Sequence, residues 1–276
     1  MERLLSWAND LITQSLSPLV PYCPLQDVTH AHEQFSHGVI QSPAITVLNW
    51  NIAKNNHLPD CLDELALIFT TYQPDLIFLQ ELRLDQASPL ALEGMGWHFV
   101  PNFMDLRSQH QFGVLTASRA RHLRHLPLHS QHREPILDTP KVALITEYAL
   151  SWSHQTLLAA NIHGINFVST AKFQAQLEQL EVQLMHHDGP ILFSGDFNTW
   201  NPNRMSCLLA MTQRLGLSAV EFAWDSHLQL KRFLRSDPLD HIFYRGMEPR
   251  SGSADVLIDC EASDHKPMVV ELQLKL

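Results

Sequence analysis

The most informative stretch of the chain is residues 191–198, which read Ile191-Leu192-Phe193-Ser194-Gly195-Asp196-Phe197-Asn198. An apolar run typical of a buried strand ends in glycine, and a carboxylate and an amide follow two residues apart. Strand alternation predicts that Asp196 and Asn198 point to the same side, at the carboxyl end of the strand. Gly195 allows the backbone to bend or to approach a ligand closely just before them.

Polar side chains recur beside other apolar runs of the chain. An amide, a carboxylate or an imidazole stands at or next to the end of each run, namely Asn51, Glu81, His163, Asp240 and the pair Asp264-His265. A fold that gathers these strand ends would build one site of carboxylates, amides and imidazoles.

Length and charge bound the kind of protein. With 276 residues, of which 45% are hydrophobic, the chain can bury a large core in one or two domains. Its formal charge of -10, from 19 basic and 29 acidic residues, does not attract a polyanion globally. Nucleic-acid binding would therefore depend on a local basic groove, and the one local basic stretch runs from Arg119 to Arg133.

The sequence favours a cytoplasmic protein. No apolar stretch approaches the length of a transmembrane span, and the N-terminus lacks the basic-then-apolar order of a signal peptide. The four cysteines are scattered without a Cys-x-x-Cys pair, which indicates reduced thiols and neither a disulfide framework nor a thiolate zinc site. No protein partner can be inferred.

The chain divides into an N-terminal helical or irregular appendage, residues 1–43, and a catalytic domain, residues 44–276. A helix is predicted over 4–12, and prolines then end it. Strands are predicted near 45–50, 76–80, 112–117, 142–149, 156–163, 190–195, 240–244, 254–258 and 267–273. Helices are predicted near 59–72, 171–187 and 203–215, the last with Asn203 as its N-cap. Mixed, largely antiparallel sheets with helices outside fit this pattern better than a doubly wound parallel sheet.

The polar set suits a hard cation. Carboxylate and amide oxygens are ligands for Mg²⁺ or Mn²⁺, and Glu81 is the first choice of protein ligand. Hydrolysis of a phosphate ester also needs a water nucleophile and donors on the phosphoryl oxygens. Asp196 can take a proton from that water or orient it, and Asn198 can donate to a phosphate oxygen. His265, if held by a carboxylate such as Asp240, can be cationic and contact the phosphate.

Six segments of the chain resemble, in their order, the motifs of the endonuclease/exonuclease/phosphatase superfamily. They are Asn49-Trp50-Asn51-Ile52, Leu79-Gln80-Glu81, Asn161-Ile162-His163, Gly195-Asp196-Phe197-Asn198, Leu239-Asp240-His241-Ile242-Phe243 and Ser263-Asp264-His265-Lys266-Pro267. The resemblance covers residues from about 45 to 274 and is closest to small uncharacterised bacterial members.

This resemblance implies a DNase I-like α/β/β/α four-layer sandwich, with two packed mixed β-sheets flanked by helices. It implies a divalent-metal phosphodiesterase or phosphatase, with Mg²⁺ or Mn²⁺ as cofactor. By the same resemblance Glu81 binds the metal, and Asn51 and Asp264 lie at the metal or its water shell. The matched catalytic groups are His163, Asp196, Asn198, Asp240 and His265.

The resemblance also covers the substrate groove. Arg133-Glu134-Pro135 is similar to a deoxyribonuclease segment whose arginine touches the phosphate backbone, although a solvated or salt-bridged arginine is an equal alternative. Lys54 and Lys141 are further candidates for phosphate binding. Lys231, Arg232 and Arg235 could flank the cleft or lie in a solvated loop.

The chain departs from the deoxyribonuclease branch at one position. That branch has a glutamate that orients the second histidine, whereas residues 109–111 here are Gln109, His110 and Gln111. We therefore expect His163 to be less basic than its counterpart, which weakens its assignment as a general acid.

The leading interpretation is a phosphodiesterase acting on a phosphoester substrate, with nucleic acid as the first choice. The main alternative is hydrolysis of a small phosphoester such as a nucleotide, a phospholipid headgroup or a sugar phosphate. The acidic charge favours a smaller or single-stranded substrate, and Arg133 favours a duplex. A non-catalytic binding module on the same fold is a third alternative.

Overall fold

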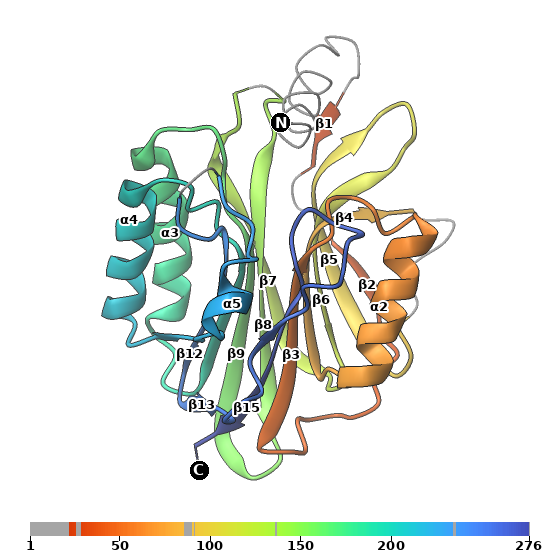
Figure 1. The fold of residues 1–276 in the computed structure, drawn as a ribbon, viewed down its shortest axis with the longest axis vertical. Helices are drawn as coiled ribbons and strands as arrows, with labels where there is room; N and C mark the ends of the chain where they lie inside the picture. Colours follow the sequence, from red (N-terminus) through yellow and green to blue (C-terminus); the bar gives the residue numbers. More distant parts are fainter. Residues whose placement is uncertain are drawn as a thin grey trace.

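A computed structural model describes residues 22–25, 29–85, 90, 92–135, 137–233 and 236–275. In this part of the chain two β-sheets pack face to face and helices cover both outer faces (Figure 1). The predicted four-layer α/β/β/α sandwich is confirmed. The helix expected over 4–12 and Arg235 lie outside the described residues.

Within the described residues the larger sheet has nine strands. In sheet order they are β1 (Tyr22–Pro24), β5 (Gly96–Asp105), β6 (Gln111–Ser118), β4 (Leu76–Leu84), β3 (Ala44–Asn51), β15 (Met268–Leu274) and β13 (Met247–Pro249), with β2 (His30–His32) paired to β5 and β14 (Asp255–Val256) paired to β15. Only β3 and β4 run parallel in this described sheet. β1 and β2 come from the expected appendage, and their pairing with β5 extends the sheet.

The second described sheet has six strands. In order they are β11 (Ser218–Ala219), β12 (Asp240–Arg245), β10 (Ile191–Asp196), β9 (Ser153–His163), β8 (Pro140–Leu150) and β7 (His122–Arg133). β9 and β10 run parallel, and the other pairs are antiparallel. The pattern predicted neither β5 nor β7, because both strands mix histidine, proline and other polar residues into the alternation.

Four helices are described: α2 (Pro59–Tyr72), α3 (Thr170–Leu184), α4 (Pro202–Arg214) and the short α5 (Trp224–His227). The prediction of Asn203 as the cap of α4 was wrong. Pro202 occupies the first helical position, where a missing N–H costs nothing, so the cap is Asn201, whose side chain accepts a hydrogen bond from the Arg204 N–H at 3.0 Å. Within the described residues, no helix has both the length and the apolar character needed to cross a bilayer.

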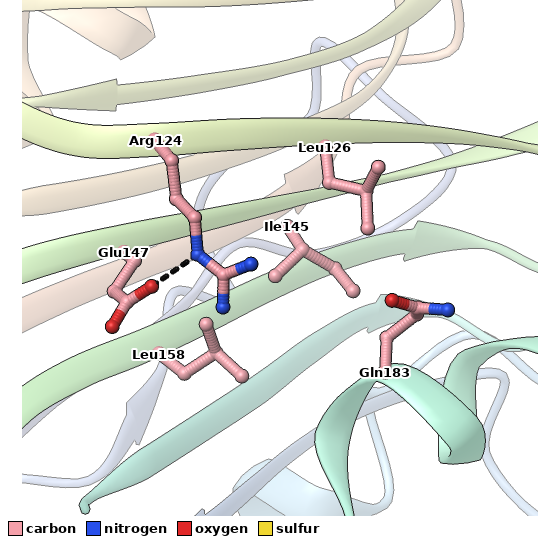
Figure 2. Close-up of a pocket in the computed structure, with 6 residues that line it drawn as sticks. All are labelled: Arg124, Leu126, Ile145, Glu147, Leu158 and Gln183. Atoms are coloured by element: carbon pink, nitrogen blue, oxygen red, sulfur yellow. Dashed lines mark hydrogen bonds and ion pairs between the residues drawn. The ribbon is translucent and has the colours of Figure 1, made fainter. Parts of the chain in front are cut away.

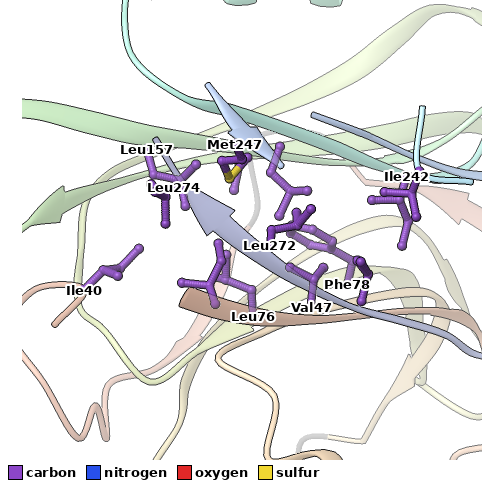
Figure 3. Close-up of a cluster of buried hydrophobic side chains, with 14 of the residues drawn as sticks. Ile40, Val47, Leu76, Phe78, Leu157, Ile242, Met247, Leu272 and Leu274 are labelled. Atoms are coloured by element: carbon purple, nitrogen blue, oxygen red, sulfur yellow. The ribbon is translucent and has the colours of Figure 1, made fainter. Parts of the chain in front are cut away.

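Strand alternation divides the core into layers. Leu48 of β3 packs toward α2, whereas Val47 packs between the sheets with Phe78 and Leu272, as Figure 3 shows. In β10, Phe193 packs toward α3 and α4, and Leu192 packs between the sheets. Polar side chains that follow these inward positions at the carboxyl ends of the strands therefore enter the space between the two sheets.

Candidate active site

Asn51 and Asp196 meet between the sheets because both continue an inward-facing alternation. Val47 and Asn51 are four residues apart on β3, as are Leu192 and Asp196 on β10. The Asn51 Nδ2 atom donates to Asp196 Oδ2 at 2.9 Å, and both side chains are buried. The predicted meeting of these two motifs therefore occurs across the two sheets.

Gly195 positions Asp196 by allowing two strands to lie close together. Its φ is +149°, and a Cβ atom there would stand 2.0 Å from the carbonyl oxygen of Ile162 on β9. The absence of a side chain at Gly195 thus lets the backbone of β10 lie close to the backbone of β9. Across the same register, Asp196 lies opposite His163 on one side and Asp240 on the other.

A β-bulge turns Glu81 into the site. The pairing of β4 with β6 shifts between Leu79 and Leu82, and Glu81 has a left-handed φ of 52°. Its Oε2 atom lies 3.3 Å from Lys54 Nζ, and its Oε1 atom lies 3.7 Å from His163 Nε2. Burial opposes ionisation, but the charges of Lys54 and Lys141 outweigh it and hold the pKa of Glu81 below its usual range.

Asp240 and His265 form a buried carboxylate–imidazole pair. The His265 Nδ1 atom lies 2.7 Å from Asp240 Oδ2, and the His265 carbonyl accepts from the Trp50 indole at 2.9 Å. Burial lowers the pKa of His265, but the charge and hydrogen bond of Asp240 dominate and raise it to about 10. The imidazolium is therefore the stable form at neutral pH.

The Asp196 carboxylate has the opposite environment. Burial and the neighbouring Asp240 raise its pKa to about 7, while the charge of His265 opposes the shift. A carboxyl group that titrates near neutrality can accept a proton and hold it during a reaction step.

His163 is held neutral by its surroundings. Burial, and then the charge of Lys141, lower its pKa well below the ordinary value. The Lys141 Nζ atom lies 3.1 Å from His163 Nε2 and 3.7 Å from Glu134 Oε1. The side chains of Gln109, His110 and Gln111 form hydrogen bonds and an ion pair with other residues, namely Leu106, Arg83, Asp85 and His30.

Glu134 is a site residue to which sequence reasoning assigned no role. It is buried, its Oε1 atom accepts from the Asn166 N–H at 2.8 Å, and burial raises its pKa. The sequence pointed to Glu134 only through its place in the segment Arg133-Glu134-Pro135, which resembles a deoxyribonuclease segment. Arg133 itself is directed elsewhere: its Nη1 atom pairs with Asp138 Oδ2 at 3.0 Å, and within the described residues it contacts none of the other candidate site residues.

Asn198 and Asp264 lie at the edges of the cluster. Asn198 follows the end of β10 with a φ of 53°, so strand alternation does not place it. Its N–H donates to Asp196 Oδ1 at 2.9 Å, and its side-chain amide donates to the Gly164 carbonyl at 3.0 Å. Asp264 is more open: its side chain is 57% exposed and pairs with Lys231 Nζ at 2.5 Å. His265 and Lys231 lower the pKa of Asp264 against the effect of burial.

Three buried amide side chains next to the site residues form a hydrogen-bonded network. Gln80 Nε2 donates to Asn49 Oδ1 at 3.0 Å and to Asn161 Oδ1 at 2.8 Å. Asn161 Nδ2 in turn donates to the Leu115 carbonyl at 2.9 Å. These three residues occur in the quoted motifs, yet sequence reasoning gave them no role. They are fully buried, and the hydrogen bonds tie the two sheets together directly beneath the site.

The donor set fits a hard cation better than a thiophilic one. One possible donor atom from each of Asp196, Asp240 and His265 lies within 4.8 Å of the others, but the His265 imidazolium has no lone pair to offer, so the donors that remain are carboxylate oxygens. The Asp240 Oδ1 atom is buried and has no hydrogen-bond partner among the described residues. Of the predicted metal ligands, Glu81 and Asp264 offer oxygens with lowered pKa, whereas the Asn51 Oδ1 atom accepts from the Ala53 N–H at 3.0 Å.

A separate small pocket lies on the outer side of the six-stranded sheet. Figure 2 shows Arg124, Glu147, Ile145, Leu158 and Leu126 from the sheet and Gln183 from α3 around it. Arg124 and Glu147 form an ion pair across it. None of the candidate site residues lines this pocket, so it is unrelated to the cluster described above.

Comparison with known proteins agrees with the fold and the motifs. A curated relative, the "UPF0294 protein" of Vibrio campbellii, is 36% identical over 236 residues, covering 83% of this chain and 78% of that protein. The catalytic domain of human Nocturnin, solved with a bound sulfate anion, superimposes with a TM-score of 0.62 at 19% identity, covering 93% of this chain and 98% of that one. ANGEL2, described as a 2',3'-cyclic phosphatase and solved with adenosine-2',3'-vanadate, gives a TM-score of 0.60 at 14% identity, covering 91% of this chain and 99% of that one.

At these low identities the two solved structures establish the fold alone. The sequence profile of the Endonuclease/Exonuclease/phosphatase family matches residues 48–265, a span that contains every candidate site residue. The chain therefore belongs to the endonuclease/exonuclease/phosphatase family, a family of hydrolytic phosphoesterases.

Proposed function

We propose that this protein is a divalent-metal-dependent phosphodiesterase that cleaves short or single-stranded nucleic acid. The observation that carries the proposal is that one buried cluster holds both a carboxylate that can accept a proton near neutral pH and an imidazole that stays protonated. Asp196, with a pKa of about 7, can accept a proton, while His265, with a pKa of about 10, stays cationic. Hydrolysis of a phosphodiester needs a proton acceptor for water and a cation for the phosphoryl oxygens.

Asp196 takes the proton of the attacking water in this proposal. As the water oxygen bonds to phosphorus, the bond from phosphorus to the leaving oxygen breaks, and that oxygen takes up a proton from solvent as it departs. The hydrogen bond from Asn51 at 2.9 Å fixes the orientation of the carboxylate that accepts the proton. Asp240 holds the His265 imidazolium in place, and His265 stabilises the charge that develops on the phosphoryl group.

His163 acts as a neutral phosphate-contacting group and not as the general acid. Its pKa is lowered by burial and by Lys141, so at neutral pH it lacks the second ring proton that a general acid would donate. Lys141 and Lys54 place ammonium groups beside His163 and Glu81, and these charges suit phosphate oxygens.

Glu81 and Asp264 would hold Mg²⁺ or Mn²⁺. Both carboxyl groups have a lowered pKa and are not fully buried, since their side chains are 24% and 57% exposed. A hard cation bound there supplies positive charge to the phosphate during the reaction.

The net charge of -10 favours the smaller substrate. The lysines that contact the described site residues are Lys54, Lys141 and Lys231, which are few for gripping a long duplex. A small phosphoester, such as a nucleotide, is the second candidate on the same observation. The description of ANGEL2 as a 2',3'-cyclic phosphatase is compatible with either choice.

A substrate panel tests the proposal. The protein is assayed with Mg²⁺ or Mn²⁺, and with EDTA, on duplex DNA, single-stranded DNA, RNA, bis-p-nitrophenyl phosphate and p-nitrophenyl phosphate. We expect metal-dependent cleavage of single strands and of the diester. Cleavage of the monoester alone would favour the small-phosphoester alternative. Inactivity on every substrate with metal bound would favour the binding module.

A further inference from the structure

Three histidines outside the candidate active site form one cluster that bridges the two sheets. His98 lies on β5 of the nine-stranded sheet, and His122 and His125 lie on β7 of the six-stranded sheet. The His98 ring centroid is 4.2 Å from that of His122 and 4.2 Å from that of His125. One nitrogen of each ring lies within 4.8 Å of the others.

A β-bulge is what places both β7 histidines on the same side. Residues three apart on a regular strand point to opposite faces. Here the pairing of β7 with β8 shifts between His122 and Arg124, so one extra residue, Leu123, enters the strand. His122 and His125 consequently face His98 together, while the Leu123 side chain is 60% exposed.

His98 is buried in a way that core packing does not explain, because its polar ring nitrogens have no hydrogen-bond partner among the described residues. The residue is only 5% exposed. A buried imidazole without partners costs free energy, because its donor and acceptor are both removed from water. Its ring stacks on that of His125 at an interplanar angle of 25° and makes an edge contact with that of His122 at 82°. His125 is exposed, which leaves a path from solvent.

We propose that His98, His122 and His125 form a binding site for a borderline divalent transition metal, with Zn²⁺ as the reference ion. Three imidazole nitrogens and one open position are a ligand set that such ions accept. Nitrogens around a tetrahedral zinc are about 3.4 Å apart, so closing the site requires the outer rings to move inward and the His125 ring to turn out of its stacked position on His98. His125 and the partly exposed His122 have the freedom to make these movements.

The protonation states also suit a metal. Burial, and then the charges of His122 and His125, lower the pKa of His98 to about 3, and burial lowers that of His122. Imidazole ligands of a metal must be neutral, and His98 and His122 are favoured in that state by their lowered pKa. The bound ion would link the two sheets near the start of β7.

Zinc binding to the full chain tests the proposal. Equilibrium dialysis against Zn²⁺, with excess Mg²⁺ present to compete at the candidate active site, gives the number of zinc ions bound per chain. We expect the parent to bind zinc, and His122→Gln and His125→Gln each to weaken one equivalent by about tenfold or more. His154→Gln, at an exposed histidine on β9, serves as the matched control and should bind zinc as the parent does.

A second readout does not depend on counting ions. Because the ion would link the two sheets only in the folded state, zinc should raise the Tm of the parent and of His154→Gln, and not that of His122→Gln or His125→Gln. His98→Phe repeats the test at the buried position if it folds. Equal zinc binding and an equal Tm shift in the parent and the two β7 variants would overturn the proposal. So would the absence of zinc binding to the parent.

Discussion

Asn51 donates a hydrogen bond to Asp196 at 2.9 Å across the gap between two sheets, although the residues are 145 positions apart in the chain. The contact brings an amide from the larger sheet to a carboxylate of the smaller one. The reactivity of Asp196 depends on how the sheets pack, because burial between them is the first cause of its raised pKa.

Replacing the proposed proton acceptor or the proposed cation should slow turnover. We expect Asp196→Asn and His265→Ala each to reduce kcat by on the order of 100-fold or more, since each group acts on the transition state. Asp196→Asn should cost little stability, because burial already disfavours the charged carboxylate. Steady-state kinetics on the diester check this, and turnover at the parental rate would remove the assigned role.

Glu81 should control metal affinity. Glu81→Gln keeps the shape of the side chain but removes an ionised oxygen whose pKa the nearby lysines hold low. We expect weaker binding of Mg²⁺ and Mn²⁺ by calorimetry and a higher metal requirement for activity. Glu221→Gln, at an exposed glutamate outside the site, is the control. Undiminished metal affinity in Glu81→Gln, or full activity in EDTA, contradicts the prediction.

The Asp240–His265 pair should make stability depend on alkaline pH. The pKa of His265 rises from 6.5 to about 10 on folding. Its stabilising contribution is therefore complete below the unfolded value and is lost as pH rises toward the folded value. We expect the free energy of unfolding of the parent to fall between about pH 7 and about pH 9.5, and to fall less in His265→Gln. Urea unfolding at the two pH values measures this, and parallel declines would refute it.

Gly195 should resist substitution for steric reasons. A Cβ at this position would lie 2.0 Å from the Ile162 carbonyl, at a φ of +149° that side chains rarely adopt. We expect Gly195→Ala to lower the free energy of unfolding by about 2 kcal/mol or more. Gly38→Ala is the matched control, because nothing lies within 4 Å of a Cβ there. Equal urea midpoints for the two variants would show that the strands can separate at no cost.

Duplex DNA should bind weakly and with a shallow salt dependence. Each lysine or arginine contact with a phosphate steepens that dependence, and this acidic chain has few candidates. Arg133 adjoins the site residue Glu134, and its ion pair with Asp138 is exposed, so a substrate phosphate can take the place of Asp138. We therefore also expect Arg133→Ala to weaken substrate binding while leaving metal binding intact. Arg250→Ala is a suitable control, since Arg250 pairs with Glu271 at 3.0 Å much as Arg133 pairs with Asp138. Fluorescence anisotropy against salt measures both, and tight duplex binding with a steep slope would contradict the first expectation.

Local sequence determined the elements that have regular periodicity. The strands β3, β4, β9, β10 and β15 were predicted from their apolar runs, and a helix was predicted near 59–72, where the structure has α2. The polar residues at the strand ends were predicted for the same reason: alternation tells which side chains follow the inward-facing ones. The family motifs, which follow one another along the chain in the order of the superfamily, added the roles expected of these residues.

The tertiary structure alone decided the features that depend on a bulge or on a neighbouring strand. The bulges at Glu81 and near His122 each reverse the direction in which a side chain points. No local sequence pattern predicts the extra residue of such a bulge. The pKa values of Asp196, His163 and His265 arise from burial and from charges on other strands. Sequence therefore determined which residues stand at the strand ends, whereas packing of the two sheets decided which of them touch and which carry a proton.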